Sequence, residues 1–114
     1  IIWTGRNEGN IANEESVQNI TQTIENIRRK NKKTKIVLVF PAPSPIEKYD
    51  NPIDSLVKKL RQSKWQNVVT VDINKYIKQQ KNWETTMFYK DYALTDDAYL
   101  QIVKLINEAV FNSK

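Results

Sequence analysis

The feature that most constrains this chain is a run of five apolar residues that ends in a proline-rich segment. Residues 36–40, Ile-Val-Leu-Val-Phe, form a continuous β-branched and aromatic run, a pattern typical of a strand buried on both faces of a parallel sheet. Pro41, Pro43 and Pro45 follow directly, and proline cannot continue a strand ladder. The sequence therefore predicts a stiff loop leaving the carboxyl end of a buried strand.

The rest of the chain alternates strand and helix patterns around this strand. Residues 1–4 and 68–73 also predict strands. Three helices are expected, after N-caps at Asn13, at Asn51 with Pro52 in the first position, and at Thr95. Their apolar stripes are Val17, Ile20, Ile24 and Ile27; Ile53, Leu56, Val57 and Leu60; and Tyr99, Ile102, Val103, Ile106 and Val110.

This alternation predicts an α/β fold, with right-handed crossovers and a parallel sheet covered by helices on both faces, in three α/β/α layers. Three strands are few for such a fold, and parallel sheets seldom keep open edges. We therefore expect an upstream segment or a second chain to complete the sheet. The first residue is Ile1 and the only methionine is Met87, which also predicts that the protein continues upstream.

Two absent residue types limit the chemistry of the chain. It contains neither histidine nor cysteine, which excludes a Ser-His pair, a Cys-His pair and thiolate metal sites within these residues. A hydrolytic base would have to come from elsewhere, and we predict no cofactor and no metal. No apolar run is long enough to cross a bilayer, and no signal peptide is recognisable, so no membrane span is expected and localisation stays open.

A basic run follows the first predicted helix. Cations at a helix C-terminus complement the helix dipole and keep the surface solvated. No aromatic residue is interleaved with them to stack on bases, so we predict no nucleic-acid partner. The run comprises Arg28, Arg29, Lys30, Lys32, Lys33 and Lys35.

Ligands of open α/β sheets bind outside the carboxyl ends of the strands. Residues 5–10, 41–45 and 91–95 are expected there. The first of these lies within residues 1–8, Ile-Ile-Trp-Thr-Gly-Arg-Asn-Glu, a segment that resembles the third conserved block of the SGNH (GDSL-type) hydrolases. The resemblance implies that Gly5 forms the turn and that Asn7 donates a hydrogen bond to the oxyanion. Glu8 stands where the family usually has aspartate.

Residues 90–99, Lys-Asp-Tyr-Ala-Leu-Thr-Asp-Asp-Ala-Tyr, are similar to the fifth block of the same family. Alignment on Leu94 and Thr95 puts Ala93 where the family has its base histidine. The orienting acid then falls on Lys90 in the commoner spacing or on Asp91 in the shorter one, and we favour Asp91. Ala93 is explained equally by a natural pseudoenzyme and by a deliberate substitution.

The nucleophile block of the family, Gly-Asp-Ser, is absent, as is the block that supplies an oxyanion glycine. Ser44 lies between two prolines and is a poor nucleophile candidate, so we interpret it as structural. The resemblance thus implies that residues 1–114 are the C-terminal portion of a single SGNH-hydrolase-like domain.

The resulting prediction is a part of a serine esterase that cleaves acyl esters, among which carbohydrate O-acetyl groups fit, and that is inactive as this chain alone. The first alternative is a non-catalytic domain that binds glycans or cell-surface polymers. Its stacking surfaces would come from Trp3, Trp65, Trp83, Tyr89 and Tyr92. A second alternative is another α/β family of flavodoxin-like or receiver type, although no glycine-rich phosphate loop follows the first strand.

Overall fold

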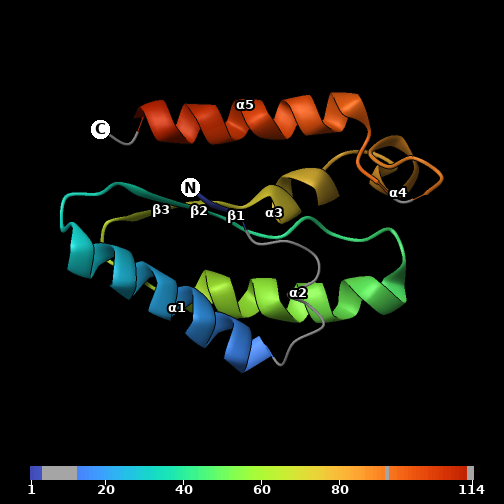
Figure 1. Cartoon of the computed structure of the whole chain (residues 1–114). Coiled ribbons are helices and arrows are strands. Elements are labelled where there is room, and N and C mark those ends of the chain that lie inside the picture. Colours follow the sequence, from blue (N-terminus) through green and yellow to red (C-terminus); the bar gives the residue numbers. More distant parts are fainter. Residues whose placement is uncertain (4–12, 92, 113–114) are drawn as a thin grey trace.

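The computed structural model describes residues 1–3, 13–91 and 93–112 of the chain (Figure 1). Strands and helices alternate along most of this length, which confirms the predicted α/β class. The elements are β1 (Ile2–Trp3), α1 (Asn13–Lys30), β2 (Ile36–Val39), α2 (Glu47–Gln62), β3 (Val68–Val71), α3 (Ile73–Lys78), α4 (Trp83–Thr86) and α5 (Asp96–Asn112).

The three strands form one parallel sheet in the order β1-β2-β3. Ile2 pairs with Leu38, and Ile36 pairs with Val68. The strand predicted from the apolar run is therefore the central one, and all four of its residues are buried, as expected for a strand with neighbours on both edges.

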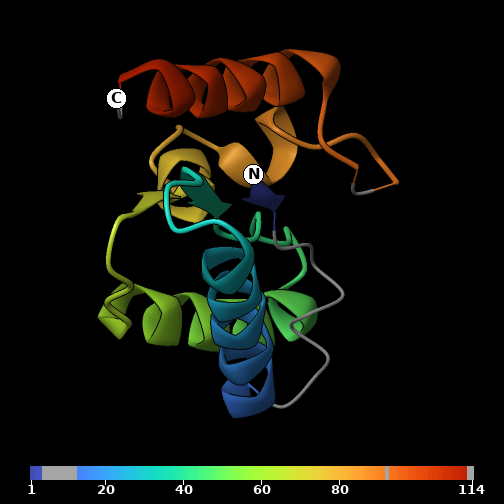
Figure 2. The same ribbon diagram turned by 60° about the vertical axis from the view of Figure 1, so that its left-hand side comes forward.

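Helices cover both faces of the sheet (Figures 1 and 2). Side chains of β2 alternate between the faces, since successive residues of a strand point to opposite sides. Ile36 and Leu38 join the cluster that packs against α1 and α2. Val37 and Val39 join the cluster that packs against α3 and α5. The two cores are thus separated by the sheet.

The second helix begins earlier than its sequence pattern predicts. We expected Asn51 to cap it with Pro52 in the first position, but α2 already begins at Glu47 and Pro52 lies inside it. That prediction is wrong. Contacts of the preceding loop stabilise the earlier start: the backbone N–H of Ile46 donates to Ser44 Oγ at 3.2 Å, and that of Asp50 donates to the Ile46 carbonyl at 2.9 Å. Pro52, lacking an N–H, leaves the Lys48 carbonyl without its usual helical donor.

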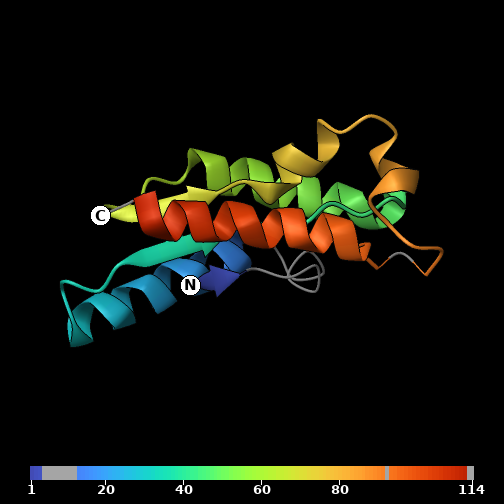
Figure 3. The same cartoon turned by 90° about the horizontal axis from the view of Figure 1, so that it is seen from above.

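A short helix and a hairpin follow α3 and lie beyond the carboxyl ends of the strands (Figure 3). No helix was predicted from the sequence at the place of α4. Asn82 takes a left-handed conformation with φ of 56° before this helix, a conformation that asparagine tolerates. The rings of Trp83 and Phe88 pack edge to face with their centroids 6.0 Å apart. This contact attaches the segment to the hydrophobic cluster that packs against α5.

Candidate functional site

The candidate site is the rim of the sheet where the parallel strands end, the carboxyl rim. Of the three segments expected there, residues 41–45 and 91–95 follow this rim on the right of Figure 1, although Tyr92 lies outside the described residues. Residues 5–10, which include Asn7 and Gly5, also lie outside the described residues, as does Glu8. The expected oxyanion donor therefore remains a prediction.

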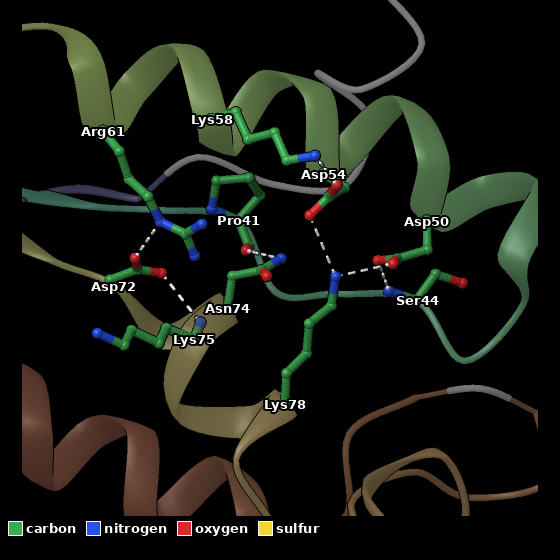
Figure 4. Close-up of polar contacts among 10 residues, drawn as sticks. All are labelled: Pro41, Ser44, Asp50, Asp54, Lys58, Arg61, Asp72, Asn74, Lys75 and Lys78. Atoms are coloured by element: carbon green, nitrogen blue, oxygen red, sulfur yellow. Dashed lines mark hydrogen bonds and ion pairs between the residues drawn. The ribbon is translucent and has the colours of Figure 1, made fainter.

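The loop after β2 is packed into the protein and does not form an open turn. Residues 41–44 are all buried. The side chain of Asn74, on α3, is 1% exposed and donates from Nδ2 to the Pro41 carbonyl at 3.2 Å (Figure 4). Its Oδ1 is buried without a hydrogen-bond partner. Asn74 thus ties the loop after β2 to the helix after β3.

Ser44 is held in a structural role, as its sequence context indicates. Its residue is 4% exposed. Its backbone N–H donates to Asp50 Oδ1 at 3.0 Å, while its hydroxyl accepts from the Ile46 N–H. Both contacts stabilise the turn into α2, and the chain holds no histidine that could activate the hydroxyl.

Ion pairs connect α2 to Asp72, the N-cap of α3, and to Lys78 within α3 along this rim (Figure 4). Lys78 Nζ lies 2.9 Å from an Asp50 oxygen and 3.4 Å from an Asp54 oxygen. Lys58 approaches Asp54 at 3.2 Å. Arg61 Nε lies 2.7 Å from Asp72 Oδ2, and the other oxygen of Asp72 caps α3 by accepting from the Lys75 N–H.

Burial by itself would raise the pKa of Asp54, but the hydrogen bond from Lys58 and the positive charge of Lys78 outweigh it and lower that pKa below its usual value.

The sequence analysis did not predict the ion pairs of this rim. The spacing of four residues between Asp54 and Lys58 was a signal for one pair, whereas the contacts of Lys78 and Arg61 depend on the tertiary fold.

The segment that resembles the fifth SGNH block forms an antiparallel hairpin before α5. The Thr95 N–H donates to the Met87 carbonyl at 3.0 Å, and the Tyr89 N–H donates to the Ala93 carbonyl at 2.8 Å. Phe88 and Leu94 form the bridge between them. Thr95 caps the helix as predicted, since its Oγ1 accepts from the Ala98 N–H at 3.2 Å.

Asp91 and Ala93 lie together at the tip of this hairpin. Oδ1 of Asp91 accepts a hydrogen bond from the backbone N–H of Ala93 at 3.2 Å, and both residues are exposed. Lys90, the other candidate for the orienting acid position, is exposed as well. The hairpin therefore holds a carboxylate beside the backbone of residue 93.

Two cavities lie beside the hairpin. One of about 540 Å³ is lined by Tyr89, Thr95 and the acidic first turn of α5, and one of about 320 Å³ is lined by Glu84, Tyr89 and Lys90. Asp91 and Ala93 line neither of them.

The aromatic side chains named for glycan stacking divide between core and surface. Trp65 and Trp83 pack against the two hydrophobic clusters. Tyr89 is 47% exposed, and its hydroxyl accepts from the Asp96 N–H at 3.2 Å. The side chain of Trp3 and all of Tyr92 lie outside the described part of the chain. Of the described candidates, Tyr89 is exposed, whereas Trp65 and Trp83 are half-buried.

Within residues 1–3, 13–91 and 93–112, no group of three or more His, Cys, Asp or Glu side chains has an arrangement suited to a metal ion. None of the helices in this part of the chain has the length and apolar character needed to span a membrane.

Comparison of the chain with models of known protein families, with curated proteins and with solved structures finds no match.

Proposed function

We propose that the chain is the C-terminal part of an ester hydrolase of SGNH type, in which Asp91 is the orienting acid and residue 93 is the base position. The hydrogen bond between Asp91 Oδ1 and the Ala93 N–H is the observation that carries the proposal. A carboxylate fixed at the backbone of residue 93 is within reach of the imidazole of a histidine placed there, and an acid that orients the histidine is what a triad requires.

The position of the hairpin gives further support. It lies at the rim toward which β1 runs, and open α/β sheets bind their ligands at this rim. In the proposed enzyme, Asn7 donates to the oxyanion, a type of contact that contributes about 3 kcal/mol to the transition state. The nucleophilic serine comes from a segment upstream of Ile1. Ala93 leaves this chain without its base.

Restoring the base tests this proposal. The protein is produced from its complete encoded sequence with Ala93→His, and hydrolysis of p-nitrophenyl acetate is followed. A positioned base raises the rate by about 10²-fold or more over the alanine form. The rate should rise with pH through the imidazole pKa, near 6.5, because only the neutral ring accepts a proton.

Two matched variants define the outcome. Ala93→Gln introduces a side chain of similar size without a base, and Ala93→His combined with Asp91→Asn keeps the base but removes the acid. We expect the first to be inactive and the second to be much slower than Ala93→His. Equal rates for Ala93→His and Ala93→Gln, with both variants folded by circular dichroism, would contradict the proposal.

A further inference from the structure

A second cavity region lies at the opposite end of the sheet, where the strands begin. It is a cavity of about 810 Å³ between the C-terminal half of α1 and the segment that joins α2 to β3. Both of these parts lie at the left of Figure 1, away from the hairpin. The volume is within the range of small-molecule sites, roughly 300–1,000 Å³.

The walls of this cavity carry an excess of positive charge. Four cations and one carboxylate line it: Arg28, Arg29, Lys32, Lys64 and Glu25. Among the described residues, the only ion pairs are those of Lys58, Lys78 and Arg61 with Asp50, Asp54 and Asp72. The four cations of the cavity therefore have no carboxylate partner in the described part of the chain.

One of these cations is fixed in place. The Arg28 guanidinium donates to four carbonyls: from one terminal nitrogen to Lys32 at 3.1 Å and Thr34 at 2.9 Å, and from the other to Gln66 at 3.5 Å and Asn67 at 2.6 Å. These neutral acceptors hold the side chain without cancelling its charge. Because both terminal nitrogens of Arg28 already donate to carbonyls, this residue supplies a fixed positive charge, and direct contacts to a phosphate would come from its neighbours. Arg29, Lys32 and Lys64 are exposed around it.

The cavity also has an apolar wall. Trp65 packs against the cluster under α1 and α2, and its indole Nε1 donates to Thr21 Oγ1 at 3.1 Å. Ile24 continues this wall. An indole held by packing and by a hydrogen bond offers a fixed surface to a planar ligand group. No aromatic residue lies within the basic run in the sequence, but in the folded protein Trp65 lies beside it.

From the unpaired cations and the fixed indole we propose that this cavity binds a small phosphorylated ligand with an aromatic body, of which a nucleoside diphosphate is representative. Arg29, Lys32 and Lys64 receive the phosphate groups, and Arg28 adds a fixed positive charge beside them. Trp65 and Ile24 receive the ring. The site is independent of the proposed esterase centre, because it lies at the other rim of the sheet and uses none of the same residues.

Calorimetric titration of the chain with ADP, inorganic pyrophosphate and adenosine tests both halves of the site. We expect ADP to bind most tightly, since it alone reaches both the cations and the indole, and its affinity should fall as salt rises. If pyrophosphate binds as tightly as ADP, the cavity attracts phosphate alone and the proposed aromatic contact is wrong. If ADP shows no saturable binding at low salt, the proposal fails.

A pair of matched variants locates the site. Lys32→Glu with Lys64→Glu reverses two cations of the wall, whereas Lys30→Glu with Lys33→Glu reverses two exposed cations of the same helix end that do not line the cavity. All four positions are exposed, so both variants should fold. The first should weaken ADP binding about tenfold or more, and the second by less than about threefold. If both double variants lose ADP affinity equally, the binding comes from general charge attraction and the proposal is overturned.

Discussion

The two rims of the sheet use charge in opposite ways. At the carboxyl rim, Asp50, Asp54 and Asp72 all have a lysine or arginine partner within 4 Å. At the opposite rim, where the strands begin (the amino rim), the cations around the 810 Å³ cavity have no carboxylate partner among the described residues. The comparison indicates that charges at the first rim hold the fold together and that those at the second are available to a ligand.

The largest effect on stability is expected from a substitution of Asn74, whose side chain joins the loop after β2 to α3. Asn74→Ala removes the donor to the Pro41 carbonyl and leaves that carbonyl buried without a partner. The free energy of unfolding should fall by about 1–3 kcal/mol. Urea denaturation measures it. Asn107→Ala, at an exposed position of α5, is the control and should change stability by less than about 0.5 kcal/mol; equal stability of the two variants would show that the buried amide does not hold the rim.

Arg28 is the exception at the amino rim, because it alone of the four cavity cations binds described carbonyls through its side chain. Arg28→Ala should lower the free energy of unfolding by about 1–2 kcal/mol, the range for a hydrogen bond from a charged donor in a partly exposed place. The neighbouring Arg29→Ala should leave it within about 0.5 kcal/mol. If both substitutions are neutral in thermal and urea unfolding, the difference between these arginines has no energetic consequence.

Lys78 tests whether the paired charges stabilise the carboxyl rim. Its side chain is 28% exposed and that of Asp50 is 15% exposed, so Lys78→Met leaves a largely buried carboxylate without its cation. We expect a loss of about 1 kcal/mol in unfolding free energy. Lys75→Met, on the same helix but with an exposed side chain, should have almost no effect. A loss at Lys75 as large as that at Lys78 would argue against a specific ion pair.

The smallest effect concerns the pH dependence that Asp54 contributes. Its pKa is lowered from 3.8 in the folded protein, so its ionised form stabilises the fold above the unfolded pKa. That contribution is lost as pH falls below 3.8 and through the lower folded value. At pH 7, Asp54→Asn should be less stable than the natural chain by under about 1 kcal/mol, because the group is partly exposed. This difference in stability should disappear in acid. A difference that persists at pH 2 would show that it comes from packing and not from the charge of Asp54.

Much of the fold could be predicted because local patterns determine it. The run from Ile36 to Phe40 has the pattern of a buried strand, and Ile36–Val39 is the central strand of the sheet. Thr95 followed by an apolar stripe placed α5 correctly. The start of α2 was missed because Ser44 and Asp50 act together across a proline-rich loop, whereas Asn51 before Pro52 has the local signature of a cap.

The polar sites were less predictable because their partners are distant in sequence. Nothing local distinguishes Asn74 from an ordinary helix residue, yet the carbonyl of Pro41 makes it a buried link. Likewise, Trp65 joins the basic run only through the packing of the segment after α2 against α1. The proximity of Asp91 to Ala93 was inherent in their spacing of two residues, while the place of Asn7 remains a prediction.

The esterase proposal requires that Asn7 and residue 93 share one rim of the sheet. Because the chain has no cysteine, spin labels can be attached at introduced pairs of cysteines, and the distance between them can be measured by pulsed electron paramagnetic resonance. The pair at Asn7 and Ala93 should give a clearly shorter distance than the pair at Lys33 and Ala93, since Lys33 lies before β2 at the amino rim. A distance for the first pair as long as that for the second would contradict the proposed active site.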